Sequence, residues 1–410
     1  MQLNKILTTK TSQMDTNISA VGSKALVYLS HLLKIKNKFK VTRVASIDGF
    51  VQSDLPVVIA YRPNSKVLSQ SGGKGVAREQ ATISALMESF ECHTAEEVSV
   101  DKVCRQVELD GEICSTQKLA VTMKDYSEND LNNWKLVKRL DNNLDCWVPF
   151  DSISLDFTRI TNYQSRSTFF LSSNGLASGS SWDMATISGI YEVIERHSLT
   201  VHELQGLDSK KRIDLGLIDN PSIQSVISRL KESEPLEVYL FDNTLWPDFP
   251  TFKCLLIGKS SRWVGFGCHS SPTISILRAI TEANQGRVIS ISGSREDMNS
   301  EVYLCTSPNH EITNEHEIPL YHPSTYDFNE KPDILSPHQL LAKIKRYHNG
   351  KWYLYRYPQI DEQVYVVRVL AEDLHGYNYP GYVSSTFLES PSETTTSYNI
   401  NKELHSPAAS

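Results

Sequence analysis

The 410-residue sequence lacks the features that mark several large classes of protein. Its N-terminal residues contain no apolar core of secretory length, and no apolar run approaches the roughly 18 residues that span a bilayer. Its seven cysteines form no CxxC pair, and their odd number is typical of reduced thiols in a cytoplasm rather than of a disulfide framework. We therefore expect a cytoplasmic protein that does not associate with membranes.

Three further absences argue against particular kinds of binding site. The twelve histidines show no HExxH spacing and no Cys/His pairing, which argues against a structural zinc site. The P-loop spacing GxxxxGK[ST] does not occur, so a Walker-type nucleotide site is not supported. The net charge of -7 argues against a broad nucleic-acid-binding surface, which would have to be basic, but it leaves room for a local basic pocket.

Sequence patterns divide the chain into an N-terminal arm, one large body and a tail. Residues 1–40 are predicted to be a polar arm followed by an amphipathic helix at 22–38. The Ser/Thr/Pro-rich residues 388–410 are predicted to be flexible. No linker divides residues 41–387, so we predict one large mixed α/β domain there. Its clearest strand signals lie at 56–61, 237–243, 251–258, 262–267 and 364–370.

One unit of sequence occurs twice, at an offset of 104 residues. Residues 71–91 read SGGKGVAREQATISALMESFE, and residues 179–196 read GSSWDMATISGIYEVIER. In both, a glycine-containing turn precedes a helix whose apolar residues follow helical spacing, while a serine and two glutamates lie on a separate stripe. A weaker third unit begins at Ser271 and Pro272, after the strand at 262–267. The polar stripes contain Ser84, Glu88 and Glu91, then Ser188, Glu192 and Glu195, then Glu282 and Gln285.

Two interpretations of these acids remain open on the pattern alone. Paired glutamates in a helix most often lie on a solvated face. Glu88 and Glu91, however, have no basic residue three or four positions away, and like charges on adjacent turns repel each other unless a cation lies between them. Two such pairs in one register suit a shared metal–phosphate site, because carboxylate oxygens are ligands that Mg²⁺ prefers.

Cations and one amide are candidates for the same site. Lys74 lies between Gly73 and Gly75, where a glycine turn lets the backbone approach a phosphate and the ammonium supplies charge. Asn174, within SSNGLASG, is most often only a turn residue, and is also a candidate neutral ligand. Guanidinium groups suit phosphate oxygens, although each arginine alone is more often part of a structural ion pair. The candidate arginines are Arg196, Arg287 and Arg295.

Five segments, taken in order, resemble the YcaO family. They are YRPNSKVLSQSGGKG, SALMESFECHTAEE, SNGLASG, SGIYEVIERHS and ITEANQGRVISISGSRED, and the resemblance covers residues 42–388. Family members bind ATP and Mg²⁺ and activate a peptide backbone amide, whose oxygen is taken to be phosphorylated and then replaced by a nucleophile. The resemblance implies a YcaO-like fold, with repeated strand–turn–helix units around a central ATP/Mg site, and a homodimer.

The resemblance also assigns roles to residues. It implies that the metal is held by Glu88, Glu91, Glu192, Glu195 and Glu282. It implies nucleotide contacts from Lys74, Ser84, Asn174, Ser188, Arg196, Gln285, Arg287 and Arg295. Catalysis is assigned to Glu88, Glu192 and Arg287. Cys92 replaces the arginine that often closes the first motif, which leaves one phosphate or ion-pair contact without its usual residue.

The resemblance leaves three product classes to consider. A side-chain thiol or hydroxyl gives an azoline, sulfide gives a thioamide, and an amine gives an amidine. Azoline-forming members typically end in a PxPxP tail, whereas this chain has isolated prolines at Pro391 and Pro407. Residues 41–96 look most like members that act with a TfuA-type partner, which are associated with thioamides. We therefore predict thioamide formation in a precursor peptide or protein with a TfuA-like partner, and azoline-forming cyclodehydration as the alternative.

Other classes of protein explain the pattern less well. The resemblance includes no fused precursor-binding domain, so a separate protein is expected to deliver the substrate. A non-catalytic nucleotide-binding scaffold is the main rival, and the complete set of acidic positions argues against it. A two-carboxylate hydrolase needs an acid and a base on opposite sides of a sugar cleft, which is usually lined by aromatic residues. A solenoid needs more regular repeats than these three.

Overall fold

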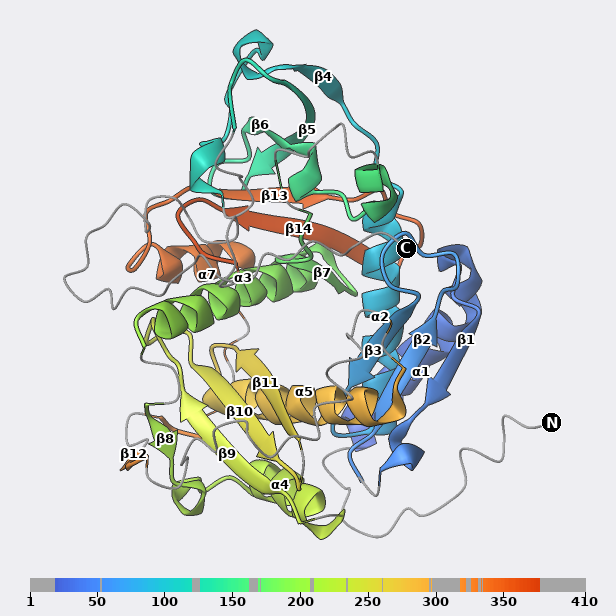
Figure 1. The fold of residues 1–410 in the computed structure, drawn as a ribbon, viewed down its shortest axis with the longest axis vertical. Helices are drawn as coiled ribbons and strands as arrows, with labels where there is room; N and C mark the ends of the chain where they lie inside the picture. Colours follow the sequence, from blue (N-terminus) through green and yellow to red (C-terminus); the bar gives the residue numbers. More distant parts are fainter. Residues whose placement is uncertain are drawn as a thin grey trace, which may run out of the picture.

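The computed structural model is mixed α/β and contains three sheets with helices packed on them (Figure 1). None of the helices in the described part of the chain is both long and apolar enough to cross a bilayer. Arg295 and the tail predicted at 388–410 lie outside the described residues. The described residues are 19–51, 54–119, 126–161, 169, 171–206, 210–233, 235–259, 261–294, 296, 318–321, 326–330, 333 and 335–376.

The first sheet is antiparallel and carries the first repeated unit. Its order is β1 (Arg43–Ser46), β2 (Val57–Tyr61) and β3 (Gln70–Lys74), and α2 (Arg78–Glu96) packs on β2 and β3. The run VVIAY forms the central strand because its β-branched residues suit a buried sheet, and its first four residues are buried. Helix α1 (Ser19–Ile35) packs against α2, close to the predicted helix at 22–38.

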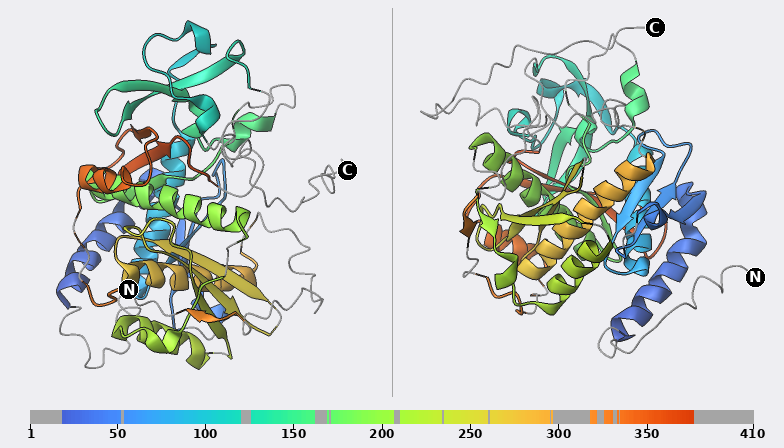
Figure 2. Two further views of the ribbon diagram at one scale, coloured as in Figure 1. Left: turned by 90° about the vertical axis from the view of Figure 1, so that its left-hand side faces the viewer. Right: turned by 60° about the horizontal axis from the view of Figure 1, so that its bottom comes forward.

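The second sheet carries the second unit. Its order is β4 (Lys102–Arg105), β5 (Leu131–Arg139), β13 (Trp352–Arg356), β14 (Tyr365–Ala371) and β7 (Leu176–Gly179), and β6 (Asp145–Pro149) also pairs with β5. Helix α3 (Trp182–Leu204) packs on β7 and β14, and α7 (Pro337–Ile344) packs on α3. Figure 2 shows β4, β5 and β6 at one end of the molecule.

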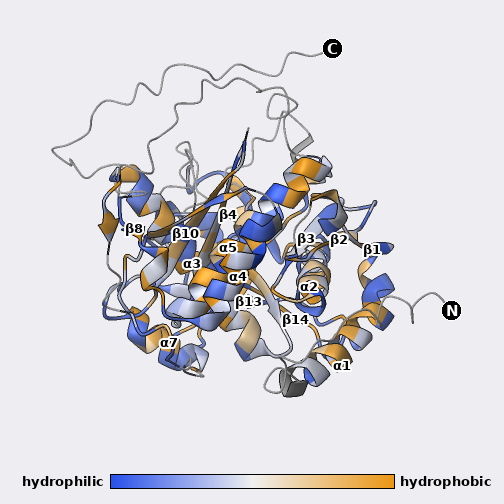
Figure 3. Cartoon of the chain, turned by 90° about the horizontal axis from the view of Figure 1, so that it is seen from below, coloured by the Kyte–Doolittle hydropathy of each residue, from blue (hydrophilic) through white to orange (hydrophobic). Residues whose placement is uncertain are grey.

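The third sheet carries the third unit at the opposite end (Figure 2). Its order is β11 (Arg262–Cys268), β10 (Thr251–Ile257), β9 (Glu237–Asp242), β8 (Arg212–Ile213) and β12 (Leu320–Tyr321). Helix α5 (Pro272–Ser292) packs on β10 and β11, and α4 (Pro221–Ser233) packs on α5. In the view of Figure 3, α1 and α7 lie at the periphery and mix hydrophilic with hydrophobic residues, as expected of helices that bury one side.

The predicted repetition of strand, turn and helix is confirmed. The three units are β3 with α2, β7 with α3, and β11 with α5. Ser181 caps α3 by accepting a hydrogen bond from the Met184 amide at 3.2 Å, and Pro272 occupies the first turn of α5 after the N-cap Ser271. The predicted strands of the interior are present with end shifts of one residue, and the α/β class is therefore correct. The single-domain organisation stays a prediction.

The glycine turn predicted around Lys74 is wrong, because Lys74 lies in strand β3 together with Gly72 and Gly73. The small size of the two glycines is needed for close packing rather than for a turn. A Cβ on Gly73 would lie 2.0 Å from the carbonyl oxygen of Ala81 and 2.3 Å from the amide nitrogen of Ala85, both in α2. In the third unit, a Cβ on Gly265 would lie 2.1 Å from the Ala283 amide nitrogen. Strand glycines therefore let each helix backbone approach its sheet closely.

The three units contact one another in a cycle. Helix α2 of the first unit contacts β7 of the second, α3 contacts β11 of the third, and α5 contacts β3 of the first. Consequently α2, α3 and α5 frame the middle of the molecule in Figure 1, and each lies beside both its own strand and the strand of the next unit.

Candidate functional site

The acidic stripes of α2, α3 and α5 act on one another electrostatically. Glu88 and Glu192 both raise the pKa of Glu91, so acids from α2 and α3 are close neighbours. Glu282 of α5 likewise raises the pKa of Glu195 of α3. The five predicted glutamates therefore form one continuous acidic region that spans the three units.

Glu91 lies at the contact between α2 and the second unit. Ser178 Oγ, on β7, donates a hydrogen bond to Glu91 Oε1 at 2.5 Å. Burial raises the pKa of Glu91 to about 8, with further contributions from the charges of Glu88 and Glu192, although the Ser178 hydrogen bond opposes the shift. In the ligand-free protein this carboxyl group is thus largely protonated at neutral pH.

The two acids of α3 are destabilised in their charged forms as well. Burial raises the pKa of Glu192 to about 7, and the positive charge of Arg196 opposes the shift. Burial also raises the pKa of Glu195, against the opposing charge of Arg196. A group of acids that resist ionisation until a cation arrives is characteristic of a functional site rather than of a solvated helix face.

Lys74 and Glu282 form an ion pair that joins β3 to α5, with about a quarter of each side chain exposed. Burial alone would raise the pKa of Glu282, but Lys74 and Arg196 outweigh it and hold the pKa below its usual value. The structure therefore brings together the lysine predicted to bind phosphate and the acid predicted to bind metal. Each supplies the opposite charge that the other needs when no ligand is bound.

The donor set fits Mg²⁺ when the nucleotide is considered with it. Among the described residues, no three Asp, Glu, His or Cys side chains are grouped closely enough to hold a metal ion by themselves. Mg²⁺ is usually bound by one or two carboxylates together with substrate phosphates and water, not by an all-protein cage. Carboxylates with raised pKa values beside Lys74 and Arg196 match that requirement, and the site is compatible with a metal–triphosphate.

Four further predicted residues lie on α2, α3 and α5. Ser84 and Ser188 are half-buried, each about one turn before the first glutamate of its stripe. Gln285 lies against β3, where a Cβ on Gly72 would come within 2.7 Å of its Nε2. Arg287 is fully buried, donates from Nη1 to Asn284 Oδ1 at 3.3 Å, and lies 6.0 Å from the Trp263 ring.

Sequence reasoning missed two cations and one hydrogen-bond donor of the site. Arg278 lies one turn before Glu282 on α5, and its charge lowers the pKa of Glu282. The sequence places Arg278 four residues before Glu282, on the same helix face, so this spacing could have identified it. Arg368 on β14 and Ser178 on β7 act on Glu192 and Glu91, and no local pattern marks them because their strands reach the site only through the tertiary fold.

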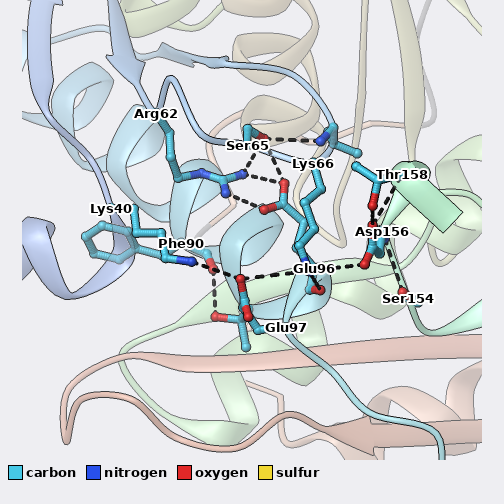
Figure 4. A network of polar contacts seen from close by, with 12 residues as sticks. Lys40, Arg62, Ser65, Lys66, Phe90, Glu96, Glu97, Ser154, Asp156 and Thr158 are labelled. Carbon is cyan, nitrogen blue, oxygen red and sulfur yellow. Dashed lines mark hydrogen bonds and ion pairs between the residues drawn. The ribbon is translucent and has the colours of Figure 1, made fainter.

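A buried ion pair fixes the far end of α2 (Figure 4). Arg62 and Glu96 form it with side chains only 1% exposed, and Arg62 Nη2 donates to Glu96 Oε1 at 2.7 Å. Ser65 Oγ donates to the same carboxylate oxygen at 2.7 Å. Cys92, one turn earlier, is close enough to Arg62 for that charge to act on its thiol. The network anchors the helix that carries Glu88 and Glu91 to the loop after β2.

Comparison with known proteins identifies the family. The family model for YcaO cyclodehydratases, described as ATP- and Mg²⁺-binding, matches residues 72–375. An uncharacterized protein of Mycobacterium tuberculosis is 29% identical over 268 residues, which cover 64% of this chain and 60% of the relative. A Rhizobium leguminosarum bv. trifolii protein, described as lying in the tfuA 3' region, is 29% identical over 281 residues, which cover 65% of this chain and 66% of the relative. The chain thus spans about 60% of the length of the first of these relatives.

Solved structures share the fold. A YcaO protein from Methanopyrus kandleri bound with AMPPCP and Mg²⁺ superposes with a TM-score of 0.66 at 20% identity, covering 85% of this chain and 89% of that one. A heterocyclase in complex with substrate and cofactor gives a TM-score of 0.62 at 18% identity, covering 82% of this chain and 50% of that one.

Proposed function

Because the chain belongs to the YcaO family, we propose that it uses ATP and Mg²⁺ to activate a backbone amide of a precursor peptide or protein for modification. The observation that carries the proposal is the acidic region itself. Five glutamates from three helices lie near Lys74 and several arginines. Burial raises the pKa values of three of them, Glu91, Glu192 and Glu195, so these carboxyl groups are poor anions until a cation neutralises them.

The metal would be held by pairs of carboxylates drawn from the five acids. When bound, Mg²⁺ neutralises the triphosphate and polarises its oxygens. Glu88 with Glu91 on α2, and Glu192 with Glu195 on α3, supply oxygen donors on adjacent turns. The Ser178 hydrogen bond orients Glu91, so that its second oxygen is available for a ligand.

The cations of the site have a complementary task. Lys74 pairs with Glu282, and its ammonium would be available to bind a phosphate if Glu282 served as a metal ligand. Arg196 lies next to Glu195 in sequence and acts on both Glu195 and Glu282, so it balances charge between α3 and α5. Phosphoryl transfer to an amide oxygen depends mainly on positioning and charge neutralisation, and these residues supply both without a dedicated nucleophile.

For the product, we favour a thioamide made with a TfuA-like partner. The support is the relative found in a tfuA 3' region, together with the likeness of residues 41–96 to TfuA-associated members. Azoline-forming cyclodehydration is the second candidate, supported by the fold shared with a heterocyclase and by the description of the family model.

Conservative variants test the activity. Glu88→Gln and Glu192→Gln should each abolish ATP consumption while the circular dichroism spectrum stays that of the folded parent and Tm does not fall, because only the metal-binding charge is removed. Glu203→Gln, at the exposed end of the same helix as Glu192, is the matched control and should keep full activity. Full ATP consumption by either of the first two variants would contradict the metal assignment.

Mass spectrometry tests the product class. The protein is incubated with a precursor peptide, ATP, Mg²⁺, sulfide and a TfuA-like protein. Exchange of one oxygen for one sulfur supports the thioamide. Loss of one water supports the azoline and overturns our preference.

A further inference from the structure

Arg368 is a buried arginine whose donors are only partly used. It lies on β14 opposite Leu176 of β7, and it is 1% exposed. Its Nη1 donates to the backbone oxygen of Asn174 at 2.9 Å. Its Nε and Nη2 are also buried and make no hydrogen bond of standard geometry among the described residues, although the guanidinium acts on the neighbouring Tyr357 hydroxyl.

The surroundings of Arg368 differ from those of Arg62, another buried arginine, which lies in the loop after β2. Arg62 is equally buried, but its guanidinium is neutralised by the Glu96 carboxylate, which accepts hydrogen bonds from both of its terminal nitrogens. Buried donors without acceptors are costly, and the cost is greatest for a charged group. Arg368 therefore has the properties of a residue whose acceptor is a ligand.

An unsatisfied acceptor lies beside it. Asn174 Oδ1 is buried and has no hydrogen-bond partner among the described residues, although the backbone oxygen of the same residue is held by Arg368. Both groups adjoin the acidic region, since the charge of Arg368 acts on Glu192. One buried edge of the site thus offers cationic donors and a neutral oxygen next to a carboxylate.

We propose that Arg368 binds a phosphate oxygen of the nucleotide and that Asn174 Oδ1 faces the metal bound to that nucleotide. The proposal rests on the proposed function. It adds a second cationic contact to the nucleotide, from Arg368 on β14, in addition to Lys74 on β3. A phosphate can accept hydrogen bonds from Nε and Nη2 together, which is the fork geometry that guanidinium groups favour. An amide oxygen is a suitable ligand for a hard cation, so one metal–phosphate unit satisfies both orphaned groups.

Calorimetric titration of the full chain with ATP and Mg²⁺ tests the proposal. Arg368→Gln should weaken binding at least about tenfold, the loss expected for charge-assisted hydrogen bonds, and Arg368→Lys should recover part of it. The control is Arg62→Lys, which alters an equally buried arginine at the far end of α2, and it should weaken binding clearly less than Arg368→Gln does. Thermal unfolding of each variant identifies any that fails to fold, and Arg368→Lys then carries the comparison.

The outcomes separate this proposal from the function on which it rests. If the parent protein binds no ATP with Mg²⁺, both fall. If the parent binds and both Arg368 variants bind ATP as tightly as the parent, only this proposal falls. Parent-like affinity for ATP combined with impaired turnover would assign Arg368 to the peptide instead. If Arg62→Lys weakens ATP binding as much as Arg368→Gln, the effect is structural and the assignment is also wrong.

Discussion

Replacing Gly73 by alanine tests how the strand glycines position the acidic helices. The added methyl would lie 2.0 Å from the Ala81 carbonyl oxygen and 2.3 Å from the Ala85 amide nitrogen. Both atoms belong to the backbone of α2, so no side-chain rotation can relieve the clash. The helix must move away from β3, and Glu88 and Glu91 must move with it.

The expected magnitude follows from these contacts. Overpacking a well-packed interior costs about 1–3 kcal/mol, and a clash with two backbone atoms of one helix should reach the upper end of that range or exceed it. Gly286 is the matched control, because a Cβ there would meet only the Val264 carbonyl oxygen at 4.0 Å. It lies within helix α5, so Gly286→Ala should stabilise the protein by about 0.5–1 kcal/mol through helix propensity.

Urea unfolding followed by circular dichroism measures both effects. Gly73→Ala should lower the midpoint, and calorimetry should show weaker binding of ATP with Mg²⁺ even at temperatures where the variant is fully folded. Gly286→Ala should raise the midpoint. A Gly73→Ala variant as stable as the parent would show that the close approach of α2 to β3 is not what requires glycine there.

Three further predictions concern charge. Arg62→Met should lower the free energy of unfolding in urea by about 3–5 kcal/mol, because it leaves the Glu96 carboxylate buried and unpaired. The double variant Arg62→Met with Glu96→Leu should recover much of that loss. Equal stabilities for the single and double variants would contradict the ion-pair argument. Glu91→Gln should stabilise the ligand-free protein by about 1–3 kcal/mol at pH 7. Burial raises the pKa of Glu91 to about 8, so at any pH above the unfolded value of about 4.3 the carboxyl group favours the unfolded chain, where it ionises more readily. A loss of stability at pH 7 would contradict this. Burial lowers the pKa of His197 to about 3 and that of His375 to about 4. The stability that these neutral rings contribute is therefore complete above the unfolded pKa of about 6.5. It is lost as the pH falls below that value, at up to about 1.4 kcal/mol per pH unit for each ring. His375→Gln should therefore reduce the slope of stability against pH between pH 6 and 5, and an unchanged slope would show that His375 does not titrate as described.

Local patterns predicted the repeated units because the residues that determine each unit are close together in the sequence. The apolar spacing of α2 and α3, the N-cap Ser181 and the proline that opens α5 are all readable from neighbouring residues. The acidic stripes could be placed for the same reason, since residues three and four apart share a helix face.

What the sequence did not predict depends on contacts between units. Gly72 and Gly73 read as a turn because glycines usually mark turns, and only the packing of α2 and Gln285 against β3 shows why a strand needs them. Arg368 and Ser178 reach the acids from β14 and β7, which pair with each other although nearly half of the chain lies between them. No periodicity within one segment can reveal such a pairing.

The central claim is that acids from α2, α3 and α5 share one metal–nucleotide site. A crystal structure with a non-hydrolysable ATP analogue and Mn²⁺ tests it most directly, because the anomalous signal of manganese locates the metal. We predict at least one manganese peak within coordination distance of two of the five carboxylates, Glu88, Glu91, Glu192, Glu195 and Glu282. Nucleotide and manganese bound elsewhere, with these carboxylates unliganded, would contradict the claim.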